Sequence, residues 1–133
     1  MEQIKHYHIL VKGEATKLAP ITCHKDGLTH WMHDVVRNQG MRMVIEPRFY
    51  YVWDEGNEGF TGSCNLATSH LAMHIWDVPR IIQADLYTCG ELDIELFLED
   101  FKRLGVDKVD YVVFNRDKGF EILKAEKGRL LCE

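Results

Sequence analysis

Ser69, His74 and Cys89 are the residues of this chain whose types and spacing could together do chemistry. A serine hydroxyl becomes a nucleophile beside a base, and the carbonyl next to Ser69 is that of Thr68. An imidazole such as that of His74 can remove a proton, and a thiol such as that of Cys89 can return one. With a base and a thiol nearby, a serine that attacks the carbonyl before it can cut its own backbone and become a reactive carbonyl group.

The spacing of these residues is regular enough to identify a pattern. The hydroxyl residue Thr61 stands eight positions before Ser69, His74 follows Ser69 by five, and the pair Cys89-Gly90 begins twenty positions after it. The stretch from Thr61 to Gly90 resembles the core of the small prokaryotic S-adenosylmethionine decarboxylases. Outside this stretch, the resemblance is one of element order.

The resemblance implies a role for each residue of the set. Ser69 would be the precursor of a pyruvoyl cofactor, and His74 would serve the self-processing. The Thr61 hydroxyl would hydrogen-bond the tetrahedral species, and Cys89 would be the acid during turnover. The family usually has glutamate where Thr68 stands and serine where Thr61 stands. A single domain spanning residues 1–133 would thus mature into residues 1–68 and a pyruvoyl-capped chain of residues 69–133.

The resemblance also implies an activity, with two alternatives left open. The pyruvoyl ketone would accept the electrons left when carbon dioxide departs from S-adenosylmethionine, which gives the aminopropyl donor for spermidine synthesis. No metal is expected. The first alternative is a pyruvoyl-dependent decarboxylase of another amino acid. The second is an unprocessed, non-catalytic homologue that acts as a ligand-binding or partner subunit.

Composition limits the other functions. A chain of 133 residues is long enough for one domain with its own core. A net charge of −5 without a cluster of Lys and Arg argues against nucleic acid as a partner. No apolar run has the ~20 residues of a membrane span, and the first residues lack a signal-peptide core, so the cytoplasm is the expected location. Four cysteines without CxxC spacing predict free thiols: Cys23, Cys64, Cys89 and Cys132.

Hydrophobic periodicity predicts two helices and a set of strands. Apolar residues at helical spacing predict helices over Asp26–Gln39 and Asp93–Leu104. β-Prone runs predict strands at Tyr7–Val11, Met41–Trp53, Gly59–Ala67, Ser69–Trp76, Arg80–Thr88, Val109–Asn115 and Phe120–Lys124. Strands grouped between helices predict an α+β fold, an antiparallel sheet with both helices on one face. The family implies a homodimer, with sheet against sheet and the helices outside.

The strands around Ser69 raise a geometric question. A hairpin turn at Asp77–Pro79 would pair His74 with Ile82 and place Cys89 opposite Ala67, a diagonal neighbour of Ser69. Ser69 and His74 are five residues apart, and an odd separation puts side chains on opposite faces of a regular strand. We therefore expect a bulge or break near Ser69.

Two simpler interpretations involve other side chains. His70 and His74 share a strand face and could bind zinc with Cys64 or Cys89. The aromatic run from Phe49 to Trp53 could stack on an adenine or a sulfonium cation, although alternating strand aromatics more often belong to a core or an interface.

Overall fold

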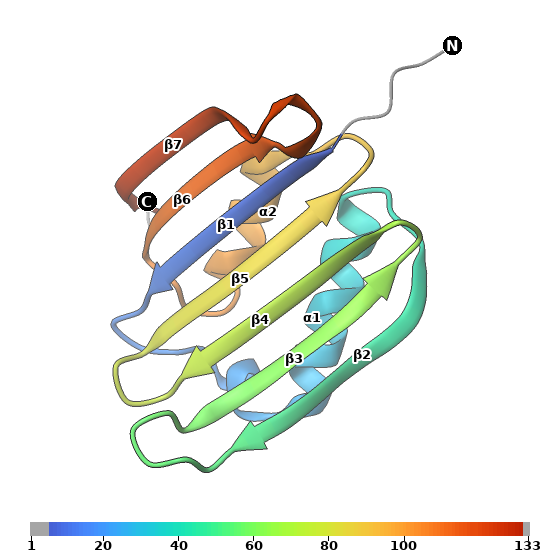
Figure 1. Cartoon of the computed structure of the whole chain (residues 1–133). Coiled ribbons are helices and arrows are strands. Elements are labelled where there is room, and N and C mark those ends of the chain that lie inside the picture. The colour runs from blue at the N-terminus through green and yellow to red at the C-terminus, as the bar shows by residue number, and fades with distance from the viewer. Residues whose placement is uncertain (1–5, 132–133) are drawn as a thin grey trace.

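The computed structural model describes residues 6–131, which form one antiparallel sheet covered on one face by two helices (Figure 1). The seven strands follow the order β2-β3-β4-β5-β1-β6-β7, and every neighbouring pair is antiparallel. The predicted α+β class is confirmed. Cys132 lies outside the described residues, and Cys23, Cys64 and Cys89 are free thiols as expected.

Each predicted strand is present, with small changes at the ends. The strands are β1 Tyr7–Glu14, β2 Met43–Val52, β3 Gly59–Leu66, β4 Ser69–Trp76, β5 Ile81–Thr88, β6 Lys108–Asn115 and β7 Glu121–Leu130. The last strand is longer than expected, because its charged residues conceal the alternation that marks a strand. The central strands β3, β4 and β5 form two consecutive hairpins, which carry the whole stretch from Thr61 to Thr88.

The two helices α1 Lys25–Asn38 and α2 Ile94–Lys102 lie against the same face of the sheet. In α1 the predicted apolar stripe is buried: Leu28, Trp31, Met32, Val35 and Val36. In α2 the Asp93 carboxylate accepts a hydrogen bond from the Leu96 amide and caps the first turn. A short 3-10 helix, Pro20–Cys23, leads into α1, and a second, Arg116–Lys118, joins β6 to β7.

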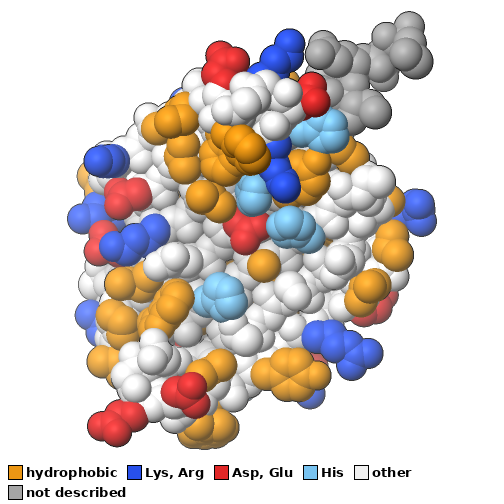
Figure 2. All heavy atoms as spheres, in the orientation of Figure 1, with side chains coloured by type: hydrophobic (Ala, Val, Ile, Leu, Met, Phe, Trp, Pro, Cys, Tyr) orange, Lys and Arg blue, Asp and Glu red, His pale blue; other side chains and the backbone are white. Residues whose placement is uncertain are grey.

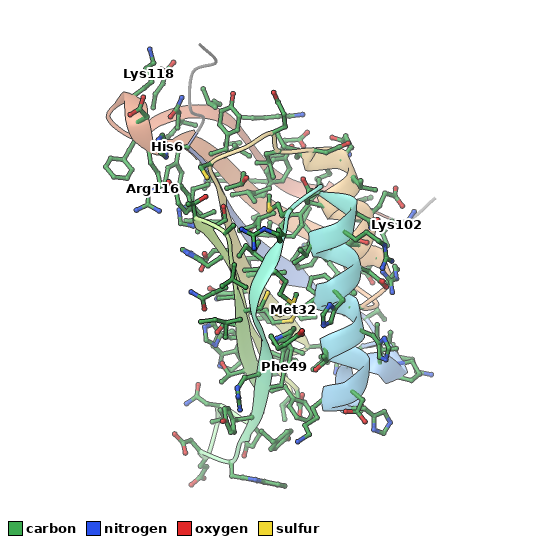
Figure 3. All side chains as sticks on the ribbon, turned by 90° about the vertical axis from the view of Figure 1, so that its right-hand side faces the viewer. His6, Met32, Phe49, Lys102, Arg116 and Lys118 are labelled. Carbon is green, nitrogen blue, oxygen red and sulfur yellow. The ribbon has the colours of Figure 1, made fainter. Side chains whose placement is uncertain are left out.

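The core fills the single layer between the helices and the sheet. Met32 and Phe49 point into this layer from α1 and β2, whereas Arg116 lies on the other side of the sheet (Figure 3). Gly62 leaves room for Phe49, since a Cβ there would lie 2.3 Å from the Phe49 ring. Trp31 is fully buried, and its indole N–H donates to the Asp100 carbonyl at 2.7 Å. No helix of residues 6–131 lies on the second face of the sheet.

The β4–β5 register differs from the predicted one by one residue. Trp76 pairs with Ile81, so the turn contains the four residues Asp77–Arg80 instead of three, and Arg80 adopts a left-handed conformation with φ 57°. His74 therefore pairs with Gln83, not with Ile82. Continuing the register past Thr88 brings Cys89 opposite Thr68, not opposite Ala67.

Candidate active site

Ser69 follows a tight turn that joins β3 to β4. Leu66 pairs with Ser69, so only Ala67 and Thr68 form the loop. Thr68 has φ 64°, the left-handed region, which a β-branched residue rarely adopts. Such a conformation costs on the order of 1–3 kcal/mol. The strained residue is the one that contributes the carbonyl of the Thr68-Ser69 bond.

Cys89 lies against this turn from the end of β5. Its backbone N–H donates to the Ser69 hydroxyl oxygen at 3.3 Å, and its Sγ is 3.9 Å from the same oxygen. The Thr68 hydroxyl also contacts the Cys89 Sγ. The predicted neighbourhood of Ser69 and Cys89 is thus present in one chain. Cys89 therefore contacts both Thr68 and Ser69.

Thr61 and His74 form a second pair on the other face of the sheet. They are cross-strand partners on β3 and β4, and the Thr61 hydroxyl contacts the His74 Nδ1. His74 is exposed, and its ring lies 6.2 Å from that of Trp76. A hydroxyl held on one imidazole nitrogen orients the ring and leaves the other nitrogen available for proton transfer.

The two pairs are separated within the chain. β4 runs from Ser69 to Trp76 without a register shift against β3, so the expected bulge near Ser69 is absent. The other neighbour of β3, strand β2, does have register shifts, between Met43 and Arg48, where extra residues of β2 face β3. Five residues of regular strand separate the Ser69 and His74 Cα atoms by about 17 Å, with their side chains on opposite faces.

Three cavities border these pairs. One of about 220 Å³ lies at the strand ends and is lined by Ser69, Thr88, Cys89 and Gly90 together with Gln39–Arg42. A second, about 120 Å³, is lined by both Thr61 and His74. The third, about 400 Å³, is a groove on the helix-free face that includes His74 and Asp85. Ligand pockets usually have about 300–1,000 Å³, so the cavity beside Ser69 and Cys89 is small for a nucleoside substrate.

A third group of side chains was missed from the sequence. Asp85 on β5 hydrogen-bonds His8 on β1 at 3.1 Å and His70 on β4 at 2.9 Å, through one carboxylate oxygen. Burial raises the pKa of Asp85, but the His8 hydrogen bond and the charge of His70 outweigh it and hold the pKa below its usual value. His8 is 62 positions from His70, and no sequence spacing connects them.

The zinc interpretation, which combined His70 and His74 with a cysteine, named the wrong set of ligands. Within residues 6–131, the one group of three possible metal ligands is His8, His70 and Asp85. Cys64 is buried on the helix side of the sheet, where burial raises the pKa of its thiol to about 11. Cys64 is therefore a protonated core residue at neutral pH, whereas Cys89 is distinguished by being partly exposed.

The comparison with protein families shows which family the chain belongs to. A sequence model described as S-adenosylmethionine decarboxylase matches residues 8–117, a range that covers most of the chain and includes the positions of both pairs. The chain belongs to the S-adenosylmethionine decarboxylase family. The resemblance carried by Thr61, Ser69, His74 and Cys89 is thereby confirmed at the level of the family.

One curated relative agrees with this assignment to the S-adenosylmethionine decarboxylase family. It is the "S-adenosylmethionine decarboxylase proenzyme" of Archaeoglobus fulgidus, 37% identical over 49 residues, which are 33% of this chain and 44% of that protein. The match thus covers less than half the length of the relative. No helix among the described residues of this family member is long and apolar enough to cross a membrane.

Proposed function

We propose that the chain is a pyruvoyl-dependent S-adenosylmethionine decarboxylase that cleaves itself between Thr68 and Ser69 and supplies the aminopropyl donor for spermidine synthesis. The observation that carries the proposal is the contact of the Cys89 thiol with Ser69, 3.9 Å from sulfur to oxygen, beside the strained Thr68. This arrangement falls inside the residues matched by the family. The name of the Archaeoglobus relative, a proenzyme, supports a processed form.

The processing step needs only water and side chains that this sequence supplies. The Ser69 Oγ bonds to the Thr68 carbonyl carbon, and the Thr68-Ser69 amide bond breaks to leave an ester and a free amine. A base, His74, removes the Ser69 Cα proton, and the Cβ–Oγ bond breaks to release Thr68 as a carboxylate. Water then replaces the nitrogen of the resulting dehydroalanine as ammonia, which leaves a ketone. Strain at Thr68 favours the first step, because the strain can relax once the amide is broken.

The residues around Ser69 fit a pyruvoyl group. Such a group supplies a ketone that accepts the electron pair released with carbon dioxide. Cys89 would hold a proton on Sγ for the substrate carbon, and the Thr88 hydroxyl accepts a hydrogen bond from the Gly90 N–H at 2.9 Å, which fixes the turn that carries Cys89. The small cavity next to Ser69 and Cys89 would admit the amino-acid end of the substrate.

We also propose that the working unit is a homodimer. Within one chain His74 lies about 17 Å from Ser69 by strand geometry. Ser69 begins β4 and Cys89 directly follows β5, so both lie at the ends of their strands. A second copy packed on the helix-free face could bring its own Thr61 and His74 around this end of the sheet to the Ser69 and Cys89 of the first. The apolar residues that this face exposes between its polar groups, among them Leu10 and Val112, support such packing. Each site would then take one pair from each copy.

Intact mass of the purified chain tests self-processing. We expect two fragments, residues 1–68 and a pyruvoyl-capped 69–133, and a single chain from Ser69→Ala. Ser63→Ala, which changes an exposed serine of β3, should be cleaved normally. Carbon dioxide release from S-adenosylmethionine and from a panel of amino acids then identifies the substrate. Cleavage with release only from another amino acid would favour the first alternative, and an uncleaved native chain would favour a non-catalytic subunit.

Co-expression tests the homodimer. Ser69→Ala keeps Thr61 and His74, whereas His74→Ala keeps Ser69 and Cys89. We expect the His74→Ala chain to remain whole by itself and to be cleaved when Ser69→Ala is expressed with it. Cleavage of His74→Ala alone, or no cleavage in the mixture, would contradict a site shared between copies.

A further inference from the structure

Three neighbouring strands place His8, His70 and Asp85 together on the helix-free face. β5 lies between β1 and β4, and Tyr87 of β5 is the cross-strand partner of both His8 and His70. Asp85 is two residues from Tyr87, so its side chain shares their face of the sheet. Figure 2 shows histidine side chains on both sides of a carboxylate near the middle of this face.

The three side chains converge on one point. The Nε2 atoms of His8 and His70 are 3.1 and 2.9 Å from the same Asp85 Oδ1, and the candidate ligand atoms all lie within 4.8 Å of one another. A tetrahedral ion with bonds of about 2.0–2.1 Å separates its ligand atoms by about 3.3 Å. The group therefore needs only small side-chain rotations to surround an ion.

The surroundings hold the two imidazoles in place. The rings of His8 and His70 lie 5.7 and 5.8 Å from the Tyr87 ring, and Phe114 packs on His8 at 5.3 Å. The side chains of His8, Asp85 and His70 are 15%, 33% and 40% exposed, so the group is anchored on one side and open on the other. An open side leaves a position for water or a further ligand, as in zinc sites with three protein ligands.

The side chains of Arg116 and His6 are directed at Tyr87. The Arg116 guanidinium lies 4.2 Å from the centre of the Tyr87 ring, and the His6 Nδ1 is 2.6 Å from its hydroxyl. Tyr87, which packs against both imidazoles, is thus held in place by these two contacts.

We propose that His8, His70 and Asp85 form a binding site for one divalent first-row transition metal ion of the zinc type. Two imidazoles and one carboxylate suit Zn²⁺ and its neighbours, whereas Mg²⁺ and Ca²⁺ require oxygen ligands. The site does not depend on the proposed self-cleavage. If cleavage occurs, however, the ion would join the two products, because His8 belongs to residues 1–68 and the other two ligands to residues 69–133.

Calorimetric titration of the chelator-treated full chain with Zn²⁺ tests the site. We expect one ion per chain. Loss of a partner outside the ligand shell already costs about 10–100-fold in affinity, so His8→Gln and Asp85→Asn should each weaken binding at least ~10-fold. His30→Gln, an exposed histidine of α1, is the matched control and should bind as the native chain does. Co²⁺ should give the intense visible absorption of a four-coordinate ion in the native chain. The His8→Gln and Asp85→Asn chains should not show this absorption.

Circular dichroism in the presence of chelator establishes that the variants are folded before binding is compared. Equal affinity in the native, His8→Gln and Asp85→Asn chains, or much less than one ion per native chain, would overturn the proposal. The three side chains would then form only a hydrogen-bonded cluster. The titration is repeated in Ser69→Ala, which cannot cleave itself. A failure of the proposed processing therefore leaves this test intact.

Discussion

Thr68 is the residue where conformation and proposed chemistry meet. A β-branched side chain at φ 64° is costly, and here it lies directly before the serine that would attack its carbonyl. The Thr68 hydroxyl is also engaged, since it contacts the Cys89 Sγ. Strain and a thiol contact are therefore both found at the Thr68-Ser69 bond, which would break in self-processing.

Replacing Thr68 by glycine should relieve this strain. In the uncleavable Ser69→Ala background, Thr68→Gly should raise the free energy of unfolding by about 1 kcal/mol, because glycine adopts positive φ without a steric penalty. Urea unfolding measures the change. Ala67→Gly, at the loop position without positive φ, should lower stability instead. In the cleavable chain, Thr68→Gly should slow self-processing. Faster processing, or a loss of stability, would show that the turn stores no useful strain.

The Cys89 thiol should matter for turnover more than for processing. Cys89→Ala keeps the backbone N–H that donates to Ser69, so cleavage should continue. Decarboxylation should fall by about 10²–10⁴-fold, the usual contribution of a positioned acid or base. Cys23→Ala, which removes an exposed thiol, provides the control. Normal turnover by the cleaved Cys89→Ala chain would assign the proton to another group.

At the scale of elements, α1 and α2 meet through Asp100 and Asp34. Asp100 is almost fully buried, and burial outweighs its contacts with Asn38 and Arg103, so the pKa of Asp100 is raised. Asp34 shows the opposite balance. Burial would raise the pKa of Asp34, but hydrogen bonds from Arg103 at 2.8 Å and Arg37 at 2.6 Å lower it.

These two carboxylates should respond oppositely to the same substitution. Asp100→Asn should raise stability at pH 7, since the raised pKa of Asp100 means that the native state disfavours the charged carboxylate. The advantage of Asn should disappear as pH falls toward the pKa of the carboxyl in the unfolded chain, about 4. Asp34→Asn should lower stability at pH 7, because a lowered pKa adds stability that is lost as pH falls through the native pKa. Urea unfolding at pH 7 and at acid pH measures both. Effects of the same sign would contradict this account of the helix contact.

The elements were predictable because each depends on local sequence, whereas the arrangement of the site was not. The stripe from Leu28 to Val36 and the alternation in β4 are visible to a reader of the sequence. The one-residue error in the β4–β5 register arose because Arg80 extends the turn by adopting φ 57°, which its residue type does not suggest. His8 joins His70 only through the position of β1 beside β5, a long-range pairing that no local pattern encodes.

At the scale of the whole molecule, the helix-free face is the unexplained surface. It holds the Thr61–His74 pair, the groove of about 400 Å³ and exposed apolar residues such as Leu10, which is 41% exposed. The opposite face is already covered by α1 and α2. A second copy on the helix-free face would bury the apolar residues of this face and bring the Thr61–His74 pair of one copy to the Ser69–Cys89 pair of the other. A change that prevents dimerisation should therefore abolish activity as well.

Leu10→Lys should therefore separate the copies and abolish self-processing. A lysine on β1 in the centre of this face would lose its hydration in a sheet-to-sheet interface, whereas in a single copy it would remain solvated. Light scattering after size exclusion should give twice the 15.5 kDa chain mass for the native protein and one chain mass for the variant. Val78→Lys, in the exposed β4–β5 turn, should remain dimeric and processed. A monomeric native chain that still cleaves itself would mean that His74 of the same chain, or another base, serves Ser69.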